Sequence, residues 1–301
     1  MIRPPAAYAA HHGFVAPARA HSALWRLLAG VLLGGVGYVV LSQLYLSVLL
    51  SAWPPETVQG FAEDLQTGST PAGMFVLLFS FGVMTLVVAC AVVILHRRSP
   101  LTLLGPLGDF AVQMRLAVVA VVVLNVALWV LPPWGMDPPM QPQLPLGRWT
   151  ALLPLSLLAV LVQVSAEELL FRGYLQQQLA ARFASPLVWM VVPSALFALG
   201  HYAPETAGDN TIWFVLWAGV FGMLMADLTA RTGTLGPAIA VHFVNNVIAM
   251  LFTSMPDNLS GLALYVLPFA TSDADAMAQW LPVDFAIMVT SWLAVRLALR
   301  R

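Results

Sequence analysis

Apolar residues dominate this chain in long runs that short polar or proline-rich connectors separate. About 20 consecutive apolar residues are needed for one α-helix to cross the hydrocarbon core of a bilayer. Runs of this kind predict eight helices, at residues 27–50, 74–95, 116–131, 150–171, 187–201, 212–228, 235–252 and 281–299. The pattern therefore predicts an all-α fold, a polytopic membrane helix bundle with about eight transmembrane helices.

The first 22 residues do not fit this pattern. They contain Arg3, Arg19 and three of the six histidines, and the apolar run that follows them is long. It is too long for the apolar core of a cleaved signal peptide. We therefore expect a disordered cytoplasmic tail at residues 1–22 and a single transmembrane domain at residues 23–301, without an internal repeat.

Composition agrees with a membrane protein. Of the 301 residues, 60% are hydrophobic and 9% are charged, whereas roughly a quarter of the residues are charged in soluble domains. The net charge of -1 gives no indication of a nucleic-acid partner, and we expect none. Cys90 is the only cysteine, which excludes an intrachain disulfide. The lipid bilayer is thus the first partner that the sequence predicts.

Arginines gather on one side of the predicted bundle. Eight crossings that start from a cytoplasmic N-terminus place one group on the cytoplasmic side, namely the arginines at positions 97, 98, 115, 172, 182, 231, 296, 300 and 301. Only Arg148 falls on the opposite side. This is the positive-inside pattern. It predicts an integral protein, which we expect in the bacterial cytoplasmic membrane, with both termini in the cytoplasm.

Two glutamates, Glu167 and Glu168, stand near the end of the fourth run, five and four residues before Arg172 respectively. Ionisable residues at membrane depth are costly, and they point to function by default. Glu168 and Arg172 share a helix face, which predicts an ion pair. Glu167 is rotated about 100° away and has no local cation. An unpaired carboxylate in apolar surroundings has a raised pKa, as a general base near neutral pH requires. In the alternative interpretation, the glutamates only mark the interfacial end of the helix, and Arg172 extends toward lipid headgroups.

Two histidines within the runs have polar or aromatic companions at helical spacing. His201 follows Phe197 by one turn, and a turn signal at residues 184–186 lies midway between Glu167 and His201. An antiparallel helical hairpin around that turn would bring the two side chains to one height, where they could share a water molecule. His242 and Asn246 are four residues apart and share a helix face. Two such donors can stabilise the oxyanion that forms when water attacks an amide carbonyl.

Straight helices do not assemble these residues into one site. Counting along the two following runs leaves His242 roughly 20 Å from the level of His201. We therefore expect tilted helices, or an unwound stretch beside a water-filled cavity. Candidate positions for such a break are the glycines at 219, 222, 233 and 236, together with Pro237.

Other polar residues within the runs have structural interpretations. Asn125 and Gln163 are typical of side chains that bridge helices in membrane bundles. Asp227 precedes Arg231 by four residues, which predicts a local ion pair.

Three motifs occur in the order Glu-Glu-x-x-x-Arg, Phe-x-x-x-His and His-x-x-x-Asn within residues 150–255. In this order they resemble the CAAX prenyl protease and bacteriocin-processing family of glutamic-type intramembrane endopeptidases. The resemblance implies that Glu167 and His201 activate water and that His242 and Asn246 form the oxyanion hole. It implies a supporting role for Glu168 and Arg172, and Phe197 belongs to the second motif. The implied substrate is a membrane-associated peptide or protein, with or without a lipid, cut near the cytoplasmic face.

The residue types leave the cofactor open. Glu167, Glu168, His201 and His242 are possible ligands for a catalytic zinc ion. We expect a metal-free mechanism without a cofactor, because the chain has no His-Glu-x-x-His motif and because Asn246 beside His242 suits an oxyanion donor.

Two other function classes also fit buried carboxylates and histidines. A proton-coupled membrane transporter uses such groups as a proton relay, although transporters commonly show internal repeats and this chain shows none. A non-catalytic membrane scaffold or immunity factor would keep the same fold and break no bond.

Overall fold

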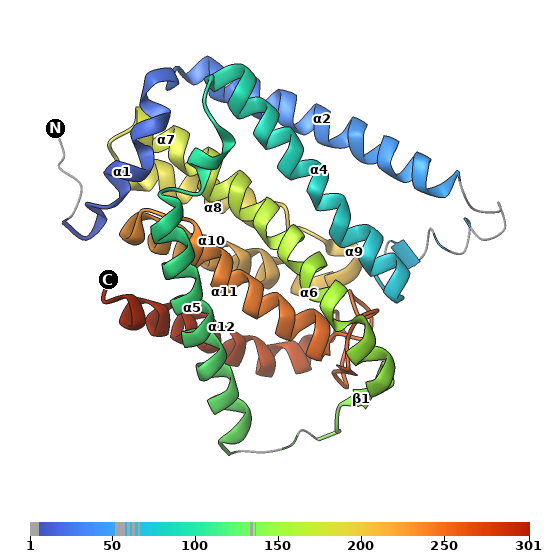
Figure 1. The fold of residues 1–301 in the computed structure, drawn as a ribbon. Coiled ribbons are helices and arrows are strands. Elements are labelled where there is room, and N and C mark those ends of the chain that lie inside the picture. Colours follow the sequence, from blue (N-terminus) through green and yellow to red (C-terminus); the bar gives the residue numbers. More distant parts are fainter. Residues whose placement is uncertain are drawn as a thin grey trace.

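The computed structural model describes residues 6–301 except for residues 52–57, 59–60, 62–63, 66, 133–134 and 136. Most of this chain is helical (Figure 1). The long helices are α2 (Leu24–Leu50), α4 (Pro71–His96), α5 (Leu107–Val130), α6 (Leu146–Glu168), α10 (Thr211–Thr232) and α12 (Ala274–Leu299). Helix α6 runs directly into a π-helical stretch, η4 (Leu169–Gln176), and then into α7 (Gln177–Arg182).

Shorter elements connect and complete these helices. The N-terminal segment holds η1 (Ala6–Tyr8), α1 (His11–Val15) and η2 (Ala16–His21), and η3 (Pro100–Leu103) follows α4. The central short helices are η5 (Leu187–Val191) with α8 (Val192–Leu199), α9 (Pro204–Ala207) with η6 (Gly208–Asn210), and α11 (Gly236–Val247) with η7 (Ile248–Phe252). Two-residue strands, β1 (Gln141–Pro142), β2 (Thr253–Ser254) and β3 (Tyr265–Val266), pair in the order β1-β3-β2, antiparallel and then parallel.

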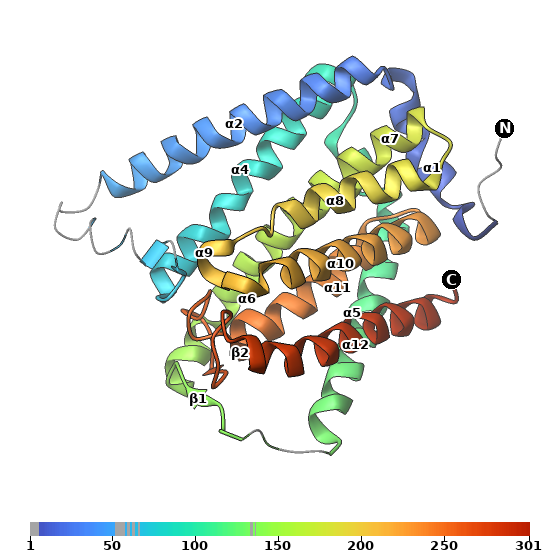
Figure 2. The same cartoon turned by 180° about the vertical axis from the view of Figure 1, so that it is seen from behind.

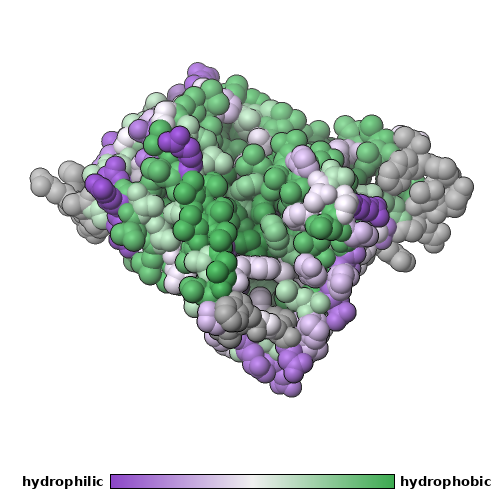
Figure 3. Space-filling view, turned by 60° about the horizontal axis from the view of Figure 1, so that its bottom comes forward, coloured by the Kyte–Doolittle hydropathy of each residue, from purple (hydrophilic) through white to green (hydrophobic). Residues whose placement is uncertain are grey.

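The helices match the eight predicted runs. Among the described residues, six helices are long and apolar enough to cross a membrane, and two shorter apolar helices, Leu187–Leu199 and Gly236–Phe252, complete the set. A space-filling view shows a broad apolar surface, with hydrophilic side chains gathered toward its margins (Figure 3). The prediction of an all-α polytopic membrane helix bundle is therefore confirmed.

Helix α11 lies at the centre of the bundle. It packs against α5, α6, α10 and α12, and α10 in turn packs against α8. Helix α2 packs against α4 on the outside of the bundle, as the two opposite views show (Figures 1 and 2). Both described ends of the chain lie at the same end of the bundle (Figure 2).

Two of the four glycines lie at the turn between α10 and α11. Gly233 ends α10 with φ 73°, a conformation that side chains with a Cβ rarely adopt. Gly236 begins α11, where a Cβ would come 2.6 Å from the carbonyl oxygen of Phe110 in α5. Gly219 and Gly222 do not break α10, which is continuous through both. At Gly222 the missing Cβ instead lets α10 approach Ser194 of α8 closely.

The N-terminal segment differs from the expected disordered tail. Residues 1–5 lie outside the described residues, whereas residues 6–21 form the three short helices η1, α1 and η2. Phe14, Val15 and Ala18 are buried at 1%, 2% and 1% exposure. Phe14 and Val15 pack in a hydrophobic cluster with Leu235 of the bundle. The expectation is wrong for these residues because their apolar side chains bury enough surface to order a segment that is otherwise polar.

Candidate active site

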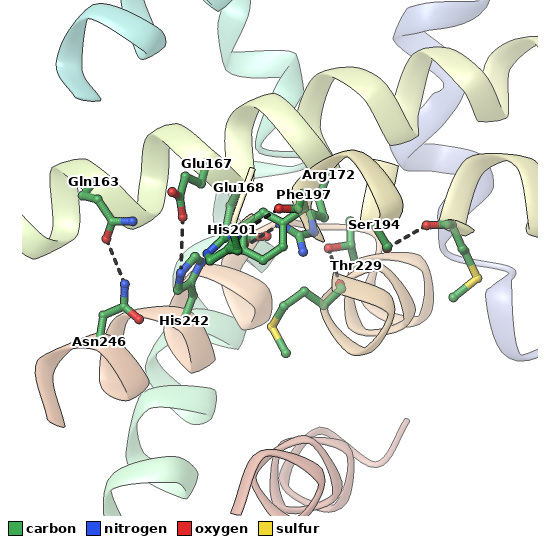
Figure 4. A network of polar contacts seen from close by, with 12 residues as sticks. Gln163, Glu167, Glu168, Arg172, Ser194, Phe197, His201, Thr229, His242 and Asn246 are labelled. Atoms are coloured by element: carbon green, nitrogen blue, oxygen red, sulfur yellow. Dashed lines mark hydrogen bonds and ion pairs between the residues drawn. The ribbon is translucent and has the colours of Figure 1, made fainter. Parts of the chain in front are cut away.

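Helices α6 and α11 face each other across four polar side chains, which we call the polar ladder: Gln163, Glu167, His242 and Asn246. On each helix the two residues are four apart and therefore share a face. Asn246 Nδ2 donates a hydrogen bond to Gln163 Oε1 at 2.9 Å. His242 Nε2 lies 3.4 Å from Glu167 Oε2. Each of these two contacts joins the earlier residue of one helix to the later residue of the other. The two helices therefore run antiparallel here (Figure 4).

Glu168 contacts both Arg172 and the polar ladder. Its Oε1 accepts from Arg172 Nη1 at 3.1 Å and lies 2.8 Å from His242 Nδ1. The side chains of Glu168 and Arg172 are 0% and 1% exposed. The ion pair that the four-residue spacing predicted is thus present and fully buried. His242 lies between two carboxylates, one at each ring nitrogen.

The aromatic ring of Phe197 lies close to three charged or polar side chains. Its centroid lies 4.6 Å from the guanidinium carbon of Arg172, 4.5 Å from the His201 ring and 6.1 Å from the His242 ring. The face of an aromatic ring attracts a cation, which accounts for the position of Arg172. Both histidine rings therefore lie near one phenylalanine ring, and the roughly 20 Å separation that straight helices would give does not occur.

His201 lies at the exposed end of this group, just after α8. Its Nδ1 is 2.9 Å from the carbonyl oxygen of Phe197. A carbonyl oxygen can only accept, so Nδ1 carries the proton and the lone pair of a neutral ring is on Nε2. No hydrogen bond joins His201 to Glu167 in the described part of the chain. His201 and Glu167 belong to the same group of side chains, but they do not contact each other directly.

Two contacts of the site were not expected from the sequence. Gln163 was interpreted only as a residue that bridges helices, and its partner turns out to be Asn246. The available signal was its position one turn before Glu167, on the same face. Phe221 of α10 packs its ring 4.9 Å from the ring of His242. Asn125, interpreted in the same way as Gln163, donates instead to Val121 O of its own helix.

A zinc ion on Glu167, Glu168, His201 and His242 stays a prediction, as does the metal-free mechanism. In the part of the chain that the structure describes, no three His, Cys, Asp or Glu side chains are grouped so as to hold a metal ion. His242 directs one ring nitrogen at Glu168 and the other at Glu167.

Comparisons with known proteins match the part of the chain that builds this site. The family model of the type II CAAX prenyl endopeptidase Rce1-like proteins matches residues 149–248. The uncharacterized protein YyaK of Bacillus subtilis (strain 168) is 29% identical over 115 residues, which are 38% of this chain and 38% of the relative. The alignment thus spans less than half of that relative's length. No solved structure matches the chain.

The matched segment begins within α6 and ends at the start of η7, so it contains the whole polar ladder together with Glu168, Arg172, Phe197 and His201. The chain is an integral membrane protein, and its residues 149–248 are similar to the type II CAAX prenyl endopeptidase Rce1-like family.

Proposed function

We propose that this protein is an intramembrane endopeptidase that hydrolyses a peptide bond with water activated by Glu167 and His201. The family match supports the reaction class. The observation that carries the proposal is the buried contact of His242 with two carboxylates, at 3.4 Å from Glu167 and 2.8 Å from Glu168. Charges buried at membrane depth are costly and point to function. A bundle held together by packing alone has no need of this group.

Glu167 and His201 are suited to hold a water molecule as two bases. The carboxylate of Glu167 can only accept, and so can Nε2 of a neutral His201, because Nδ1 of that ring is bound to Phe197 O. A water between them donates both hydrogens and directs its lone pair at a substrate carbonyl. As the water oxygen bonds to the carbonyl carbon, Glu167 takes the proton.

His242 and Asn246 are suited to stabilise the resulting oxyanion. The ionised side chains of Glu167, Glu168 and Arg172 together carry one net negative charge, and the imidazolium form of His242 would balance it. An imidazolium held through Nδ1 by Glu168 has an N–H at Nε2 to donate. The amide of Asn246 is oriented by Gln163, and its second N–H remains to donate. When the oxyanion collapses, the C–N bond breaks and the amine leaves with the proton from Glu167.

The proposed substrate is a membrane-associated peptide or protein, with or without a lipid, and the mechanism uses no cofactor. We place cleavage near the cytoplasmic face of a bacterial cytoplasmic membrane. Along the continuous helix Leu146–Arg182, Glu168 lies closer to the Arg182 end than to the Leu146 end. The arginine-rich ends of the helices are cytoplasmic by the positive-inside pattern.

A cleavage assay with the purified full chain in lipid vesicles tests the proposal. The substrate is an internally quenched peptide with a farnesylated C-terminal CAAX sequence, and the same peptide without the lipid is a second arm. We expect Glu167→Ala to lower turnover by roughly 100-fold to 10,000-fold and His201→Ala by roughly 100-fold. Glu205→Ala removes an exposed carboxylate from α9 and should leave turnover unchanged.

Equal turnover of the wild type and Glu167→Ala would exclude the proposed mechanism. A chelator arm tests the metal-free step, because loss of activity that zinc restores would contradict it.

A further inference from the structure

A cavity lies away from the polar ladder, between the N-terminal segment and the turn from α7 to η5. It has a volume of about 360 Å³, which is within the range of small-molecule sites. Its walls come from η1, α1 and η2 on one side and from residues 180–184 with Trp189 on the other. We call it the N-terminal pocket. Figures 1 and 2 place α1 beside α7, at the end of the bundle where both described ends of the chain lie.

The charged side chains that line this pocket are all basic. Arg19, Arg182, His11 and His12 line it, together with Tyr8, and none of its lining residues is an aspartate or glutamate. Within the described residues, neither Arg19 nor Arg182 has an ion-pair partner; the arginines that have one are Arg172 and Arg231. The pocket therefore holds two uncompensated guanidinium groups.

Neighbouring groups set how much positive charge remains. Burial lowers the pKa of His11 to about 3, so this ring stays neutral at physiological pH. Arg19 Nη2 lies 3.3 Å from His12 Nδ1, which accepts from the guanidinium when that ring is neutral. The helix that ends at Arg182 contributes roughly half a negative charge at its C-terminus. The two positive charges of Arg19 and Arg182 exceed this partial negative charge, so the pocket remains cationic.

The remaining walls are apolar. Val15, Ala180, Ala181 and the ring of Trp189 line the pocket beside the arginines. A ligand that fits this pocket has an anionic group that contacts the two guanidinium groups and a short apolar part that contacts these walls. Phosphate oxygens match the paired N–H donors of arginine. Basic pockets between helices at the cytoplasmic side of a membrane protein are suited to phospholipid headgroups.

We propose that the N-terminal pocket binds the phosphate of an anionic phospholipid headgroup, with Arg19 and Arg182 as its ligands. The lipid glycerol then lies against Val15 and Trp189. This site is separate from the proposed active site and does not depend on it. A bound lipid would tie the N-terminal segment to the end of the helix that carries Glu167 and Glu168.

The test counts lipids bound to the purified full chain in detergent by native mass spectrometry. Short-chain phosphatidylglycerol should bind roughly tenfold more tightly than short-chain phosphatidylcholine. Arg19→Gln/Arg182→Gln should lose that preference. Arg300→Gln/Arg301→Gln removes the same charge from exposed residues at the same end of the bundle and should keep it. Ala184→Trp fills the pocket without a change of charge and should also abolish the preference.

Several results would overturn the proposal. If both double variants lost the preference for phosphatidylglycerol equally, any surface charge would suffice for lipid binding. Unchanged binding in Ala184→Trp would place the lipid elsewhere. Inorganic phosphate is the competing arm: if it displaces phosphatidylglycerol at equal concentration, the pocket takes free phosphate and not a lipid headgroup.

Discussion

Helix α2 and the continuous helix Leu146–Arg182 have almost the same hydropathy but very different surroundings. Their most apolar windows have mean hydropathies of 1.9 and 1.8, yet 11% of the first window and 39% of the second are buried within the protein. Hydropathy therefore predicts entry into the bilayer and not position in the bundle. The buried side chains of the second helix include Gln163, whose amide needs a protein partner that lipid cannot provide, and Glu167 and Glu168 follow it in the same helix.

The largest effect should come from breaking the buried ion pair of the central helix. Arg172→Leu removes the guanidinium group that pairs with Glu168, a side chain at 0% exposure that then keeps only its contact with His242 among the described residues. This should lower the free energy of unfolding by about 3–5 kcal/mol. Unfolding in detergent, followed by circular dichroism, measures this loss. The double variant Glu168→Leu/Arg172→Leu removes both charges and should be less destabilised than Arg172→Leu. Equal or greater loss in the double variant would contradict the charge argument.

A second variant tests how the outer helix is attached to the central one. Gly30 of α2 lies against the hydroxyl group of Tyr174, which contacts His96 Nε2 at 2.9 Å. A Cβ at this position would collide with that hydroxyl group, so Gly30→Ala should lower the free energy of unfolding by about 1–3 kcal/mol. Gly35→Ala is the matched control in the same helix, because nothing lies within 4 Å of its added Cβ. Similar unfolding of the two variants would mean that α2 is not attached through Tyr174.

Local rules explain what could be predicted from the sequence. A helix in the bilayer needs a continuous apolar run, and the eight runs match the observed helices. The pair of Glu168 and Arg172 follows from the geometry of a single helix. Neither requires knowledge of how distant segments pack. The catalytic roles of Glu167, His201, His242 and Asn246 stay predictions until turnover is measured.

Long-range packing explains what could not be predicted. The count along straight helices placed His242 at a different height from His201. In the structure, α8 already ends at Leu199, before His201. Residues 200–210 then carry the chain through α9 and η6 to the start of α10 (Figure 2). Helix α11 starts close against α5 at Gly236, which sets the height of His242. The order of residues 6–21 likewise depends on a distant contact, that of Phe14 with Leu235.

The N-terminal segment should respond to pH, unlike the lipid-facing part of α2. Burial lowers the pKa of His11 from 6.5 to about 3, so the unfolded segment binds a proton more readily than the folded one. Its stability is therefore complete above pH 6.5 and falls between pH 6.5 and pH 3, with a loss of about 2 kcal/mol at pH 5. Hydrogen exchange of residues 11–15, corrected for the intrinsic rate, measures this change. A variant His11→Gln lacks the titrating group, and the same pH dependence in that variant would exclude His11 as the cause.

The smallest and most specific effect separates two polar residues that looked alike in the sequence. Gln163→Leu removes the acceptor that orients Asn246, whereas Asn125→Leu removes a bond that stays within α5. If Asn246 donates to the oxyanion, Gln163→Leu should lower kcat about tenfold, which corresponds to 1.4 kcal/mol, with little change in KM. Asn125→Leu should leave both constants unchanged.

A merely structural role for Gln163 would lower stability and not kcat, so thermal unfolding of both variants is measured alongside turnover. Residues that act as one unit are not additive. Gln163→Leu should therefore cost far less in the Asn246→Ala background than in the wild type. Additive losses in kcat would mean that Gln163 does not act through Asn246, and the polar ladder would then be two independent contacts between α6 and α11.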